Sequence, residues 1–435
     1  MKSLKSKLYE KIEEMRPRTR DLLKNHSDVV IDKVTIGQAL GGMRSIKSLV
    51  TDISYLDPNE GIRYRGYTLP ELFEKLPKAP GAEMPYVEGL FYLLLTGDIP
   101  TKDEIVDVAD EFNKRKKVPA YVFDVINAMP MDSHPMAMFS IAVMAMQKES
   151  VFVKRYNEGF NKNDYWDATY EDGLNLLARL PEIGAYIYRR KYKEGKIIAS
   201  DPKLDMGANF AKMLGIDKPY DEVARMYFII HADHESGNAS AHTGHLVAST
   251  LSDLYYSISS GVNALAGPLH GLANQEVLSW LQDVMNKMQG QRPTEEIMKK
   301  FVWDTLSSGQ VIPGFGHAVL RKTDPRYTIQ REFCLKYLPN DPIFEYVDIL
   351  FKVVPPILLE QGKAKNPWPN LDAQSGVIQW HYGLKEYDYY TVLFGIGRAI
   401  GIVSNIIWDR ALLYPLERPK SLTTGMLEDI VKKST

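Results

Sequence analysis

The spacing of the apolar residues is the feature that most restricts how this chain can fold. In residues 86–95, 221–230 and 274–288, apolar residues recur at steps of three and four, which is the period of an amphipathic helix. Alternating patterns typical of strands are scarce, and the best of them lies near residues 29–36. No internal repeat or coiled-coil heptad is present in the sequence. We therefore expect an all-α (mostly α) protein.

The length and charge of the chain narrow the classes of function. A chain of 435 residues is too long for one simple core, so two domains are expected. The formal net charge is only −2, which gives no reason to expect nucleic acid as a partner. Cys334 is the only cysteine, which excludes an intramolecular disulfide and a cysteine zinc cage and is typical of a reducing compartment.

The N-terminal segment has a helical pattern. Leu4, Leu8, Ile12 and Met15 follow one another at helical spacing among Lys and Glu residues. This pattern predicts an amphipathic helix that belongs to the fold. No signal peptide is expected, and the acidic residues argue against a transit peptide, which is poor in acids.

A second apolar segment, residues 389–408, resembles a membrane span. Its single charged residue is Arg398, and a lone Arg at a bilayer centre costs roughly 2.5–3.5 kcal/mol on insertion scales. We therefore expect a buried helix of a large protein and no membrane as a partner. Because a buried guanidinium cannot lose its proton, Arg398 needs an anionic partner from the protein or from a substrate.

Glycine and proline gather in four segments, and loops of this kind bring the backbone close to ligands. The segments are residues 41–44, 266–271, 312–317 and 366–372. The last three end at or just after His270, His317 and Asp372. Neutral imidazole can donate a hydrogen bond to an oxyanion, and a carboxylate can accept a proton from carbon. Two histidines and one carboxylate therefore suit an enolisation followed by addition to a carbonyl.

Two other interpretations of the motifs are weaker. Four closely spaced histidines could bind zinc, but no His-Glu-x-x-His motif and no second cysteine supports a metal site, so none is predicted. Three glycines in the apolar segment loosely resemble a dinucleotide fingerprint, yet too few residues follow them for βαβ units. Small residues that allow close helix packing are the better interpretation. The residues concerned are His231, His234, His242, His245, Gly395, Gly397 and Gly401.

Arginines can supply the binding half of such a site. Arg326 and Arg418, taken singly, are more often solvated side chains. Arg398 differs because its neighbours are apolar and burial without a partner is costly. A dicarboxylate is a suitable partner, since guanidinium groups bind carboxylates in a two-pronged geometry.

Three motifs in these loops resemble the signatures of the citrate synthase family, in its dimeric, mitochondrial-type (si-type) branch. They are Ala-Gly-Pro-Leu-His-Gly-Leu-Ala-Asn-Gln-Glu at residues 266–276, Pro-Gly-Phe-Gly-His-Ala-Val-Leu-Arg-Lys-Thr-Asp-Pro-Arg-Tyr at 313–327 and Asn-Pro-Trp-Pro-Asn-Leu-Asp at 366–372. The motifs are long and specific. The likeness extends from residue 41 to residue 420, so it covers nearly the whole chain.

The resemblance implies an architecture and a reaction. A large helical domain, residues 1–270 and 377–435, would carry a smaller inserted helical domain, residues 271–376, with the active site in the cleft between them. Oxaloacetate binding would close the cleft and complete the acetyl-CoA site. The reaction would condense acetyl-CoA with oxaloacetate and hydrolyse citryl-CoA to citrate, in the tricarboxylic acid cycle. No metal and no cofactor would be needed, because the CoA thioester is a substrate.

The resemblance also implies roles for single residues. His270 would stabilise the thioester oxygen while Asp372 removes a methyl proton, and His317 would polarise the ketone of oxaloacetate. The site would be shared across a homodimer. Oxaloacetate or citrate would be bound by His234, Asn238, Arg326, Arg398 and, from the partner subunit, Arg418. CoA would be bound by Arg44, Val311, Ile312, Gly314, Phe315, Gly316, Ala318, Arg321, Lys365 and Asn370.

Three positions depart from the family pattern. Phe315 stands where the mitochondrial proteins usually have Tyr, which matters little for recognition by backbone. Gln374 replaces the usual His two residues after Asp372, and this bears on the pKa of that base. Lys162 takes the place of an arginine that would meet a CoA phosphate from the partner subunit, and Lys lacks the planar fork.

Two rival functions remain open. A 2-methylcitrate synthase uses propionyl-CoA with the same machinery, and one methylene is worth only about 1–3 kcal/mol of discrimination. A non-catalytic acyl-CoA or dicarboxylate-binding protein is disfavoured, because pure binding needs no base. For the location, the opening Met and the lack of a transit pattern favour a bacterial cytoplasm over a processed mitochondrial matrix protein.

Overall fold

The computed structural model describes residues 2–364 and 366–434, and most of these residues are helical. The predicted all-α class is therefore confirmed. Before residue 270 the α-helices are α1 (Leu4–Asn25), α2 (Ile36–Leu40), α3 (Leu69–Lys75), α4 (Val87–Thr96), α5 (Lys102–Arg115), α6 (Ala120–Ala128), α7 (Pro135–Ala145), α8 (Val151–Glu158), α9 (Tyr165–Tyr192), α10 (Met206–Leu214), α11 (Tyr220–His231), α12 (Ala239–Ser249) and α13 (Leu254–Leu265). After it they are α14 (Ala273–Met288), α15 (Glu295–Ser307), α16 (Pro325–Tyr337), α17 (Pro342–Gln361), α18 (Asp372–His381), α19 (Tyr390–Leu412) and α20 (Thr424–Ser434). Short 3-10 helices are η1 (Met146–Glu149), η2 (Lys162–Asp164) and η3 (Tyr387–Tyr389).

The N-terminal helix α1 forms as its apolar pattern predicts. The side chain of Ser3 caps the helix by accepting a hydrogen bond from the backbone N–H of Ser6 at 3.3 Å, which satisfies one of the free donors of the first turn. Leu4, Leu8 and Ile12 are buried, and α1 packs against α4 and α19. The predicted amphipathic helix is confirmed.

Helix α19 lies at the centre of the core. Two helical stretches, Pro135–Glu158 and Tyr387–Leu412, are long and apolar enough to cross a membrane by length and composition alone. The apolar window of the second is 100% buried inside the protein, and that of the first is 50% buried. Helix α19 packs against α9, α11, α12 and α13. The prediction of a buried helix around Arg398 is therefore confirmed.

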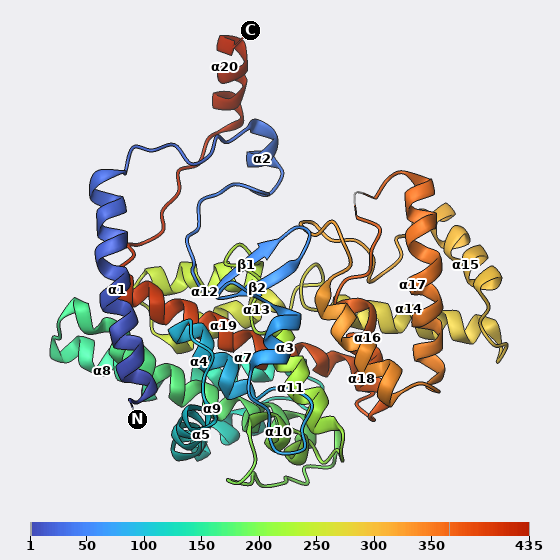
Figure 1. Cartoon of the computed structure of the whole chain (residues 1–435), viewed down its shortest axis with the longest axis horizontal. Coiled ribbons are helices and arrows are strands. Elements are labelled where there is room, and N and C mark those ends of the chain that lie inside the picture. The colour runs from blue at the N-terminus through green and yellow to red at the C-terminus, as the bar shows by residue number, and fades with distance from the viewer. Residues whose placement is uncertain (1, 365, 435) are drawn as a thin grey trace.

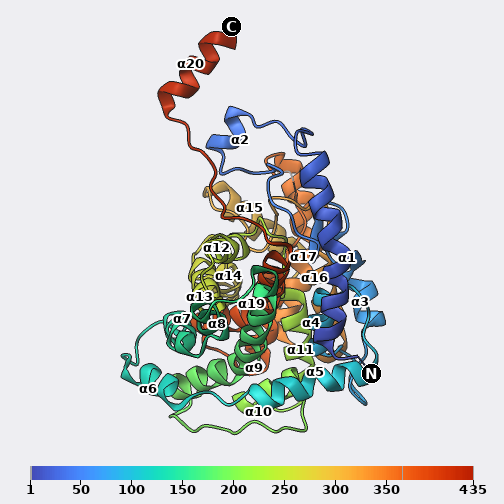
Figure 2. The ribbon, with the colours of Figure 1, turned by 90° about the vertical axis from the view of Figure 1, so that its left-hand side faces the viewer.

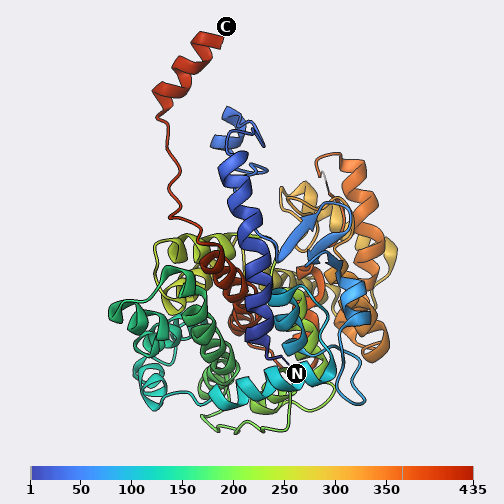
Figure 3. The ribbon, with the colours of Figure 1, turned by 60° about the vertical axis from the view of Figure 1, so that its left-hand side comes forward.

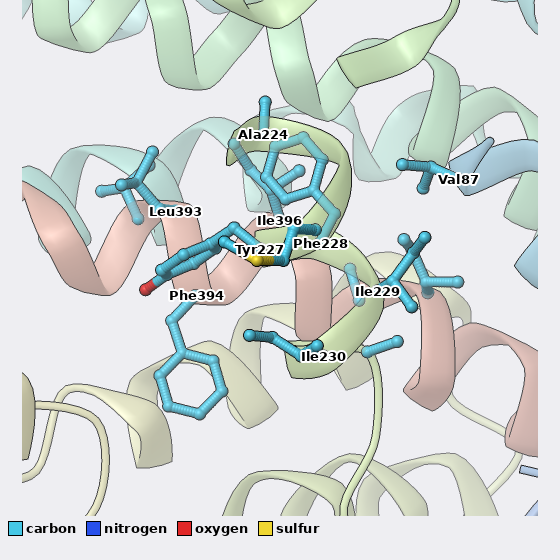
Figure 4. Close-up of a cluster of buried hydrophobic side chains, with 14 of the residues drawn as sticks. Val87, Ala224, Tyr227, Phe228, Ile229, Ile230, Leu393, Phe394 and Ile396 are labelled. Atoms are coloured by element: carbon cyan, nitrogen blue, oxygen red, sulfur yellow. The ribbon is translucent and has the colours of Figure 1, made fainter. Parts of the chain in front are cut away.

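Close packing between α11 and α19 explains the glycines of α19. Figure 4 shows side chains of the two helices gathered in one buried cluster. The backbone N–H of Gly401 donates to the carbonyl oxygen of Ala232 at 3.2 Å, and a Cβ at Gly401 would lie 2.3 Å from that oxygen. A Cβ at Gly397 would lie 3.2 Å from the Cβ of His231. These glycines allow two helices to approach, and they lie inside a helix instead of in a dinucleotide-binding turn.

Helices α14 to α18 form a second group on one side of the molecule (Figure 1). Helix α14 packs against α18, α15 against α17, and both α16 and α17 against α18. Helix α16 also packs against α3, which belongs to the first part of the chain. The loops that carry the predicted catalytic residues begin or end at helices of this group.

The alternating pattern near residues 29–36 does not form a strand. Residues 29–35 form an extended connection without strand pairing, and α2 begins at Ile36. The apolar side chains there are exposed, Val30 at 74% and Ile31 at 70%. The alternating pattern therefore does not bury one face of a strand against a core. The described strands form one small antiparallel sheet of β1 (Ser54–Asp57), β2 (Gly61–Tyr64) and β3 (Tyr67–Thr68).

Two segments leave the body of the protein on the same side. They are residues 26–50, called here the N-terminal arm, and residues 413–434, called the C-terminal arm. Figures 2 and 3 show both arms, with α2 on the first and α20 at the end of the second. No residue of α20 is buried. Residues 415–419 follow an extended course beyond α19.

Candidate active site

The three predicted catalytic residues come from three connections between helices. His270 lies between α13 and α14, and His317 lies between α15 and α16. Asp372 is the first residue of α18. Each position follows a glycine- or proline-rich turn, as the sequence suggested, so the side chains are presented by loops that rigid helices support.

His234 lies among these groups. Its ring packs edge-to-face against the ring of His317, with 5.3 Å between the centroids. Burial holds the pKa of His234 well below its usual value, and it is lowered further by the charges of Arg326, His317, Arg398 and His270, in that order. Its Nε2 atom is buried and has no hydrogen-bond partner among the described residues. The predicted histidines and arginines are therefore near enough to influence one another, and His234 has a free ring nitrogen for a ligand.

A short hydrogen-bond chain fixes the tautomer of His270. The backbone N–H of Ser240 donates to Nε2 of His270 at 3.3 Å, and the hydroxyl of Ser240 lies 2.9 Å from the same atom. That hydroxyl in turn donates to Oδ1 of Asn238 at 2.9 Å. Because Nε2 is the acceptor, the proton of the neutral ring lies on Nδ1. Burial, followed by the charge of Arg398, lowers the pKa of His270 to about 4, so His270 is a neutral donor near pH 7.

The other end of this chain is Arg398. Its Nη1 donates to Oδ1 of Asn238 and its Nε donates to the carbonyl oxygen of His231, both at 3.1 Å. The guanidinium also lies over the ring of Phe394, 5.1 Å from the centroid. Arg398 is 1% exposed, and no acidic side chain of the described residues forms an ion pair with it. Burial lowers the pKa of Arg398 against the opposing charge of Asp233, and unused donors remain for an anionic ligand.

His317 is held in the opposite tautomer. Its Nδ1 accepts hydrogen bonds from the backbone N–H groups of Val319 at 3.0 Å and Leu320 at 3.1 Å. The proton of the neutral ring therefore lies on Nε2. Burial lowers the pKa of His317 to about 4, and the charge of Arg326 acts in the same direction. His317 is thus a second neutral donor.

Arg326 already has a partner within the protein. The carboxylate of Asp324, the residue that caps α16, accepts hydrogen bonds from Nε at 3.0 Å and from Nη2 at 2.6 Å. Both side chains are buried. Asp324 was not among the predicted site residues, although Asp followed by Pro is a recognised start of a helix. The pair leaves Nη1 of Arg326 for a ligand.

Asp372 is a carboxylate with a raised pKa. Its backbone N–H donates to Oδ1 of Asn370 at 2.9 Å. Burial raises the pKa of Asp372 to about 6, while the charge of Arg326 opposes that rise. No described residue donates a hydrogen bond to its carboxylate oxygens. A carboxylate that titrates close to neutral pH is well matched to the work of a general base.

The loops that carry His317 and Asp372 are joined by backbone contacts. The N–H of Gly316 donates to the carbonyl oxygen of Trp368 at 2.9 Å, and the N–H of Asn370 donates to that of Gly314 at 2.9 Å. The amide of Asn370 also donates to the carbonyl oxygen of Gly316 at 2.8 Å. Gly314 has a φ of +80°, and a Cβ there would lie 2.7 Å from a Cα atom of α18. Only glycine satisfies both conditions, so the two loops form one unit.

This unit contains most of the residues predicted to bind CoA through their backbone. Some of the backbone groups are already engaged, since the carbonyls of Gly314 and Gly316 and the N–H of Gly316 bind residues of the 366–372 loop. Val311 and Ala318 are exposed and Ile312 is buried. Phe315 pairs with Pro369 through a β-bridge. Fewer backbone N–H and carbonyl groups are therefore free to bind CoA than was expected from the sequence.

The basic residues predicted for CoA have different surroundings. Nη1 of Arg321 donates to the carbonyl oxygens of Val319 and Leu320, each at 2.8 Å. Arg44 is exposed on the N-terminal arm, and Lys162 is exposed at the start of η2. No described contact joins either of them to the catalytic loops. Lys365 lies outside the described residues.

Arg418 is separated from the other predicted residues within one chain. The C-terminal arm is anchored just before it, because the N–H of Glu417 donates to the hydroxyl of Ser249 at 3.1 Å and its carboxylate lies 3.3 Å from Nε2 of His242. Arg418 itself is exposed and makes no hydrogen bond or ion pair with a described residue. The prediction that it acts in the site of a partner subunit stays a prediction.

The closely spaced histidines have separate partners. Nδ1 of His231 lies 2.8 Å from the carbonyl oxygen of Tyr227, and Nδ1 of His245 lies 2.7 Å from the carboxylate of Asp409. Across residues 2–364 and 366–434, no group of three or more His, Cys, Asp or Glu side chains is arranged to hold a metal ion. The four histidines therefore do not form one metal site, and each has its own structural or ligand-binding role.

Sequence reasoning missed Ser240, whereas it had singled out Gln374. Ser240 is the hydrogen-bond partner of His270, and its only signal in the sequence is a small polar residue at the start of a helix. Gln374 is fully buried and donates to the carbonyl oxygen of Gln330 at 3.4 Å. It makes no hydrogen bond with Asp372, so any effect on that base passes through the packing of α16 and α18.

The comparison with known families decides between the remaining interpretations. The family described as "Citrate synthase, C-terminal domain" matches residues 42–420. This chain belongs to the citrate synthase family. The mitochondrial citrate synthase of Daucus carota is 54% identical over 434 residues, which is 99% of this chain and 92% of that protein. The probable mitochondrial citrate synthase of Glossina morsitans morsitans is 52% identical over 99% of this chain and 93% of that protein.

A solved structure agrees with the assignment. The crystal structure of citrate synthase from Pyrobaculum aerophilum has a TM-score of 0.78 and 27% identity, and the match covers 92% of this chain and 97% of that one. The protein is therefore an enzyme of the acyltransferase type with citrate synthase activity, and the rival functions are not favoured. This activity needs no metal cofactor, and CoA is part of a substrate.

The relatives do not support one sequence prediction. The bacterial cytoplasm was favoured as the location, whereas the similar proteins named above carry the description mitochondrial. The prediction relied on the opening residues, and a processed protein can have the same opening.

Proposed function

We propose that His270, His317 and Asp372 carry out the condensation of acetyl-CoA with oxaloacetate and the hydrolysis of citryl-CoA. Asp372 accepts a proton from the methyl group of acetyl-CoA while Nδ1–H of His270 donates to the thioester oxygen, which gains negative charge as the enol form develops. Nε2–H of His317 donates to the ketone oxygen of oxaloacetate, so that the new carbon–carbon bond forms at a polarised carbonyl. Water then attacks the thioester, which yields citrate and CoA.

The single observation that supports these roles is the pair of opposite tautomers. Both rings are neutral because burial lowers both pKa values to about 4. Each ring uses one nitrogen as an acceptor within the protein, Nε2 in His270 and Nδ1 in His317. Each ring therefore keeps one N–H that can donate to a substrate oxygen. Because the rings are neutral, neither is an imidazolium that could give its proton to Asp372.

The oxaloacetate carboxylates are proposed to bind Arg398, Arg326 and His234. Among the described residues, Arg398 has donors to spare and no acidic partner, and the buried Nε2 of His234 has no hydrogen-bond partner. Arg326 would share its guanidinium between Asp324 and the substrate. A buried arginine without an anion is costly, so substrate binding would relieve that cost.

Release of free thiol from acetyl-CoA on addition of oxaloacetate tests the proposed reaction. We expect release that depends on both substrates, with acetyl-CoA preferred over propionyl-CoA in kcat/KM. The preference should be about 10- to 200-fold, the range for one methylene. A higher kcat/KM for propionyl-CoA would contradict the acetyl-CoA assignment, and no release with either thioester would contradict catalysis.

We propose that residues 271–376 form a small domain that closes on the remainder when oxaloacetate binds. The second helix group occupies this part of the chain, and its contacts run mainly within the group. Closure would exclude water from the enol intermediate. In calorimetric titrations acetyl-CoA should bind weakly to the free enzyme and more tightly with an oxaloacetate analogue present. Equal affinity in both titrations would contradict closure.

We propose that the protein is a homodimer. Helices α7, α12 and α13 pack side by side and leave large apolar side chains exposed, namely Ile141 40%, Met144 36%, Leu246 42%, Leu251 37% and Tyr256 41%. Apolar groups gathered on one face are typical of a protein interface. Sedimentation velocity should give twice the 49.4 kDa chain mass, and a monomer at micromolar concentration would contradict the proposal.

The mitochondrial matrix is the location that the relatives' names support. Detection of the protein in fractionated cells of its source tests it. We expect the mitochondrial fraction, and detection in the cytosol alone would contradict this location.

A further inference from the structure

A large cavity lies beside the catalytic loops, and its described lining contains none of the residues proposed to touch a substrate. Its volume is about 1150 Å³. One wall is a single face of α16, and the opposite wall is α3 with the segment that follows it. The two walls therefore belong to the two helix groups that are proposed to move against each other. The residues of these walls are Thr328, Ile329, Glu332, Phe333, Lys336 and Tyr337 on α16, and Pro70, Phe73, Lys78, Ala82, Glu83 and Met84 opposite.

The lining combines flat apolar rings with amines. Phe333, Tyr337 and Trp368 contribute rings. Phe333 is 3% exposed and packs on Tyr337 with 4.6 Å between the centroids, so a planar ligand can stack on Tyr337 and Trp368. Lys336 is ion-paired with Glu83 across the cavity. The other amines, Lys78 and Lys322, form no ion pair with a described residue.

Two amines of the cavity are left without an ion-pair partner in the described part of the chain. The carboxylate of Glu60 is paired with Arg63, and that of Glu83 with Lys336. Lys78 and Lys322 then have no carboxylate within ion-pair distance among the described residues, and Glu83 and Asp57 act on them only over a longer range. An anionic group near the two amines would supply the ion pairs that they lack.

The cavity is connected to the active site through the backbone. Trp368, which lines it, accepts a hydrogen bond from the N–H of Gly316, next to His317. Pro325, which also lines it, precedes Arg326 and lies so close to β2 that a Cβ at Gly61 would be 2.4 Å from the Pro325 ring. A ligand in the cavity therefore contacts the chain segments that hold two of the substrate-binding side chains.

We propose that this cavity binds an aromatic anion and that its occupancy changes the affinity for oxaloacetate. The ring system stacks on Tyr337 and Trp368, and the anionic group lies near Lys78 and Lys322. Because both helix groups line the cavity, the ligand binds best at one spacing of its walls, and linkage then requires a reciprocal effect on oxaloacetate. The coupling rests on the proposed function, whereas the binding itself does not.

Titration of the full chain with 1-anilinonaphthalene-8-sulfonate tests the site, since this aromatic anion fluoresces when it leaves water. Saturating CoA is present, so that the proposed CoA site is filled. We expect saturable binding that weakens about five- to tenfold in the variant with both Lys78→Gln and Lys322→Gln, as for partly exposed charge pairs. The matched control, Lys75→Gln on α3 outside the cavity, should bind like the unchanged protein. Equal affinity in all three proteins would overturn the site.

A second pair of variants tests the position of the ligand. Thr328 lines the cavity and is exposed, so Thr328→Phe should place a ring in the space of the ligand and abolish binding. Leu335→Phe places the same ring at an exposed position of the same helix outside the cavity and should leave binding unchanged. Circular dichroism identifies a variant that fails to fold, and the lysine variants then decide the outcome.

The coupling is tested with the same probe. The KM for oxaloacetate should shift at least threefold at saturating probe in the unchanged protein and not in Thr328→Phe. An unchanged KM with the probe bound would overturn the coupling. Because binding is read by fluorescence without turnover, an inactive enzyme would contradict the proposed function while leaving the site itself tested.

Discussion

The catalytic loops and the two arms differ in how completely one chain organises them. Around the loops, His270, His317 and Asp372 each have a defined backbone or side-chain partner, and two loops are joined by three hydrogen bonds. On the arms, Arg44 and Arg418 are exposed. Both sets carry residues predicted for the same reaction.

The difference separates chemistry from substrate anchoring. Proton transfer needs donors and a base within a few tenths of an ångström of their working positions, and the buried loops can provide this within one chain. A flexible Arg or Lys side chain can still bind a carboxylate or phosphate group of a substrate. It needs a protein surface that brings the substrate within its reach. In the proposed homodimer, the second chain would supply that surface to the arms.

Removing a catalytic group should give the largest effect. Asp372→Asn or His270→Ala should lower kcat by about 10²–10⁴, since each removes a proton acceptor or an oxyanion donor. Oxaloacetate binding, measured by calorimetry, should remain nearly intact. Asp283→Asn, at an exposed position of α14, is the matched control and should have normal kcat. Near-normal turnover in either catalytic variant would show that the loops do not hold the base and the donor.

A change at Arg398 should have the next largest effect. Arg398→Lys keeps the charge but loses the two-pronged geometry, and oxaloacetate binding should weaken by roughly 1.5–3 kcal/mol, the range for a hydrogen bond to a charged group. Arg410→Lys replaces another buried arginine, one that donates to the carbonyl oxygen of Ser252 at 2.8 Å, and should leave oxaloacetate affinity unchanged. Equal KM values for oxaloacetate in both variants would mean that Arg398 binds no substrate carboxylate.

The pH profile should show one acidic limb. The raised pKa of Asp372 is about 6, and a base works only when deprotonated, so kcat should fall about tenfold per pH unit below pH 6. His270 and His317, with pKa values lowered to about 4, stay neutral there and add no limb between pH 5 and pH 8. Initial rates at saturating substrates measure the profile. A rate that stays constant down to pH 5 would contradict Asp372 as the base at this pKa.

The candidate catalytic residues could be singled out from sequence because local signals and distant motifs agreed. Gly/Pro turns precede His270, His317 and Asp372, and helical periodicity gave the class of fold. Ser240 and Asp324 could not be predicted as partners of His270 and Arg326. A serine at a helix start and an Asp before Pro have ordinary explanations as helix caps, and only the folded chain brings Ser240 to its histidine.

For the two arms, the local sequence predicted less of the structure. Alternation near residues 29–36 suggested a strand, but a strand needs a partner, and within residues 2–364 and 366–434 none pairs with this segment. The extended course of residues 415–419 was predictable because proline on both sides of Arg418 disfavours helix. The residue that Arg418 meets could not be read from the local sequence.

Subunit mixing tests most directly the claim that one chain supplies the chemistry and its partner supplies Arg418. One variant lacks Asp372 and another lacks Arg418, as in Asp372→Asn and Arg418→Ala, and each is nearly inactive alone. When the two are unfolded together and refolded, half of the dimers are mixed, and one of the two sites in each mixed dimer is intact. We predict recovery of about a quarter of the unchanged activity. If Arg418 served its own chain, every site would carry one lesion, and no recovery in dimers of confirmed mass would contradict the shared site.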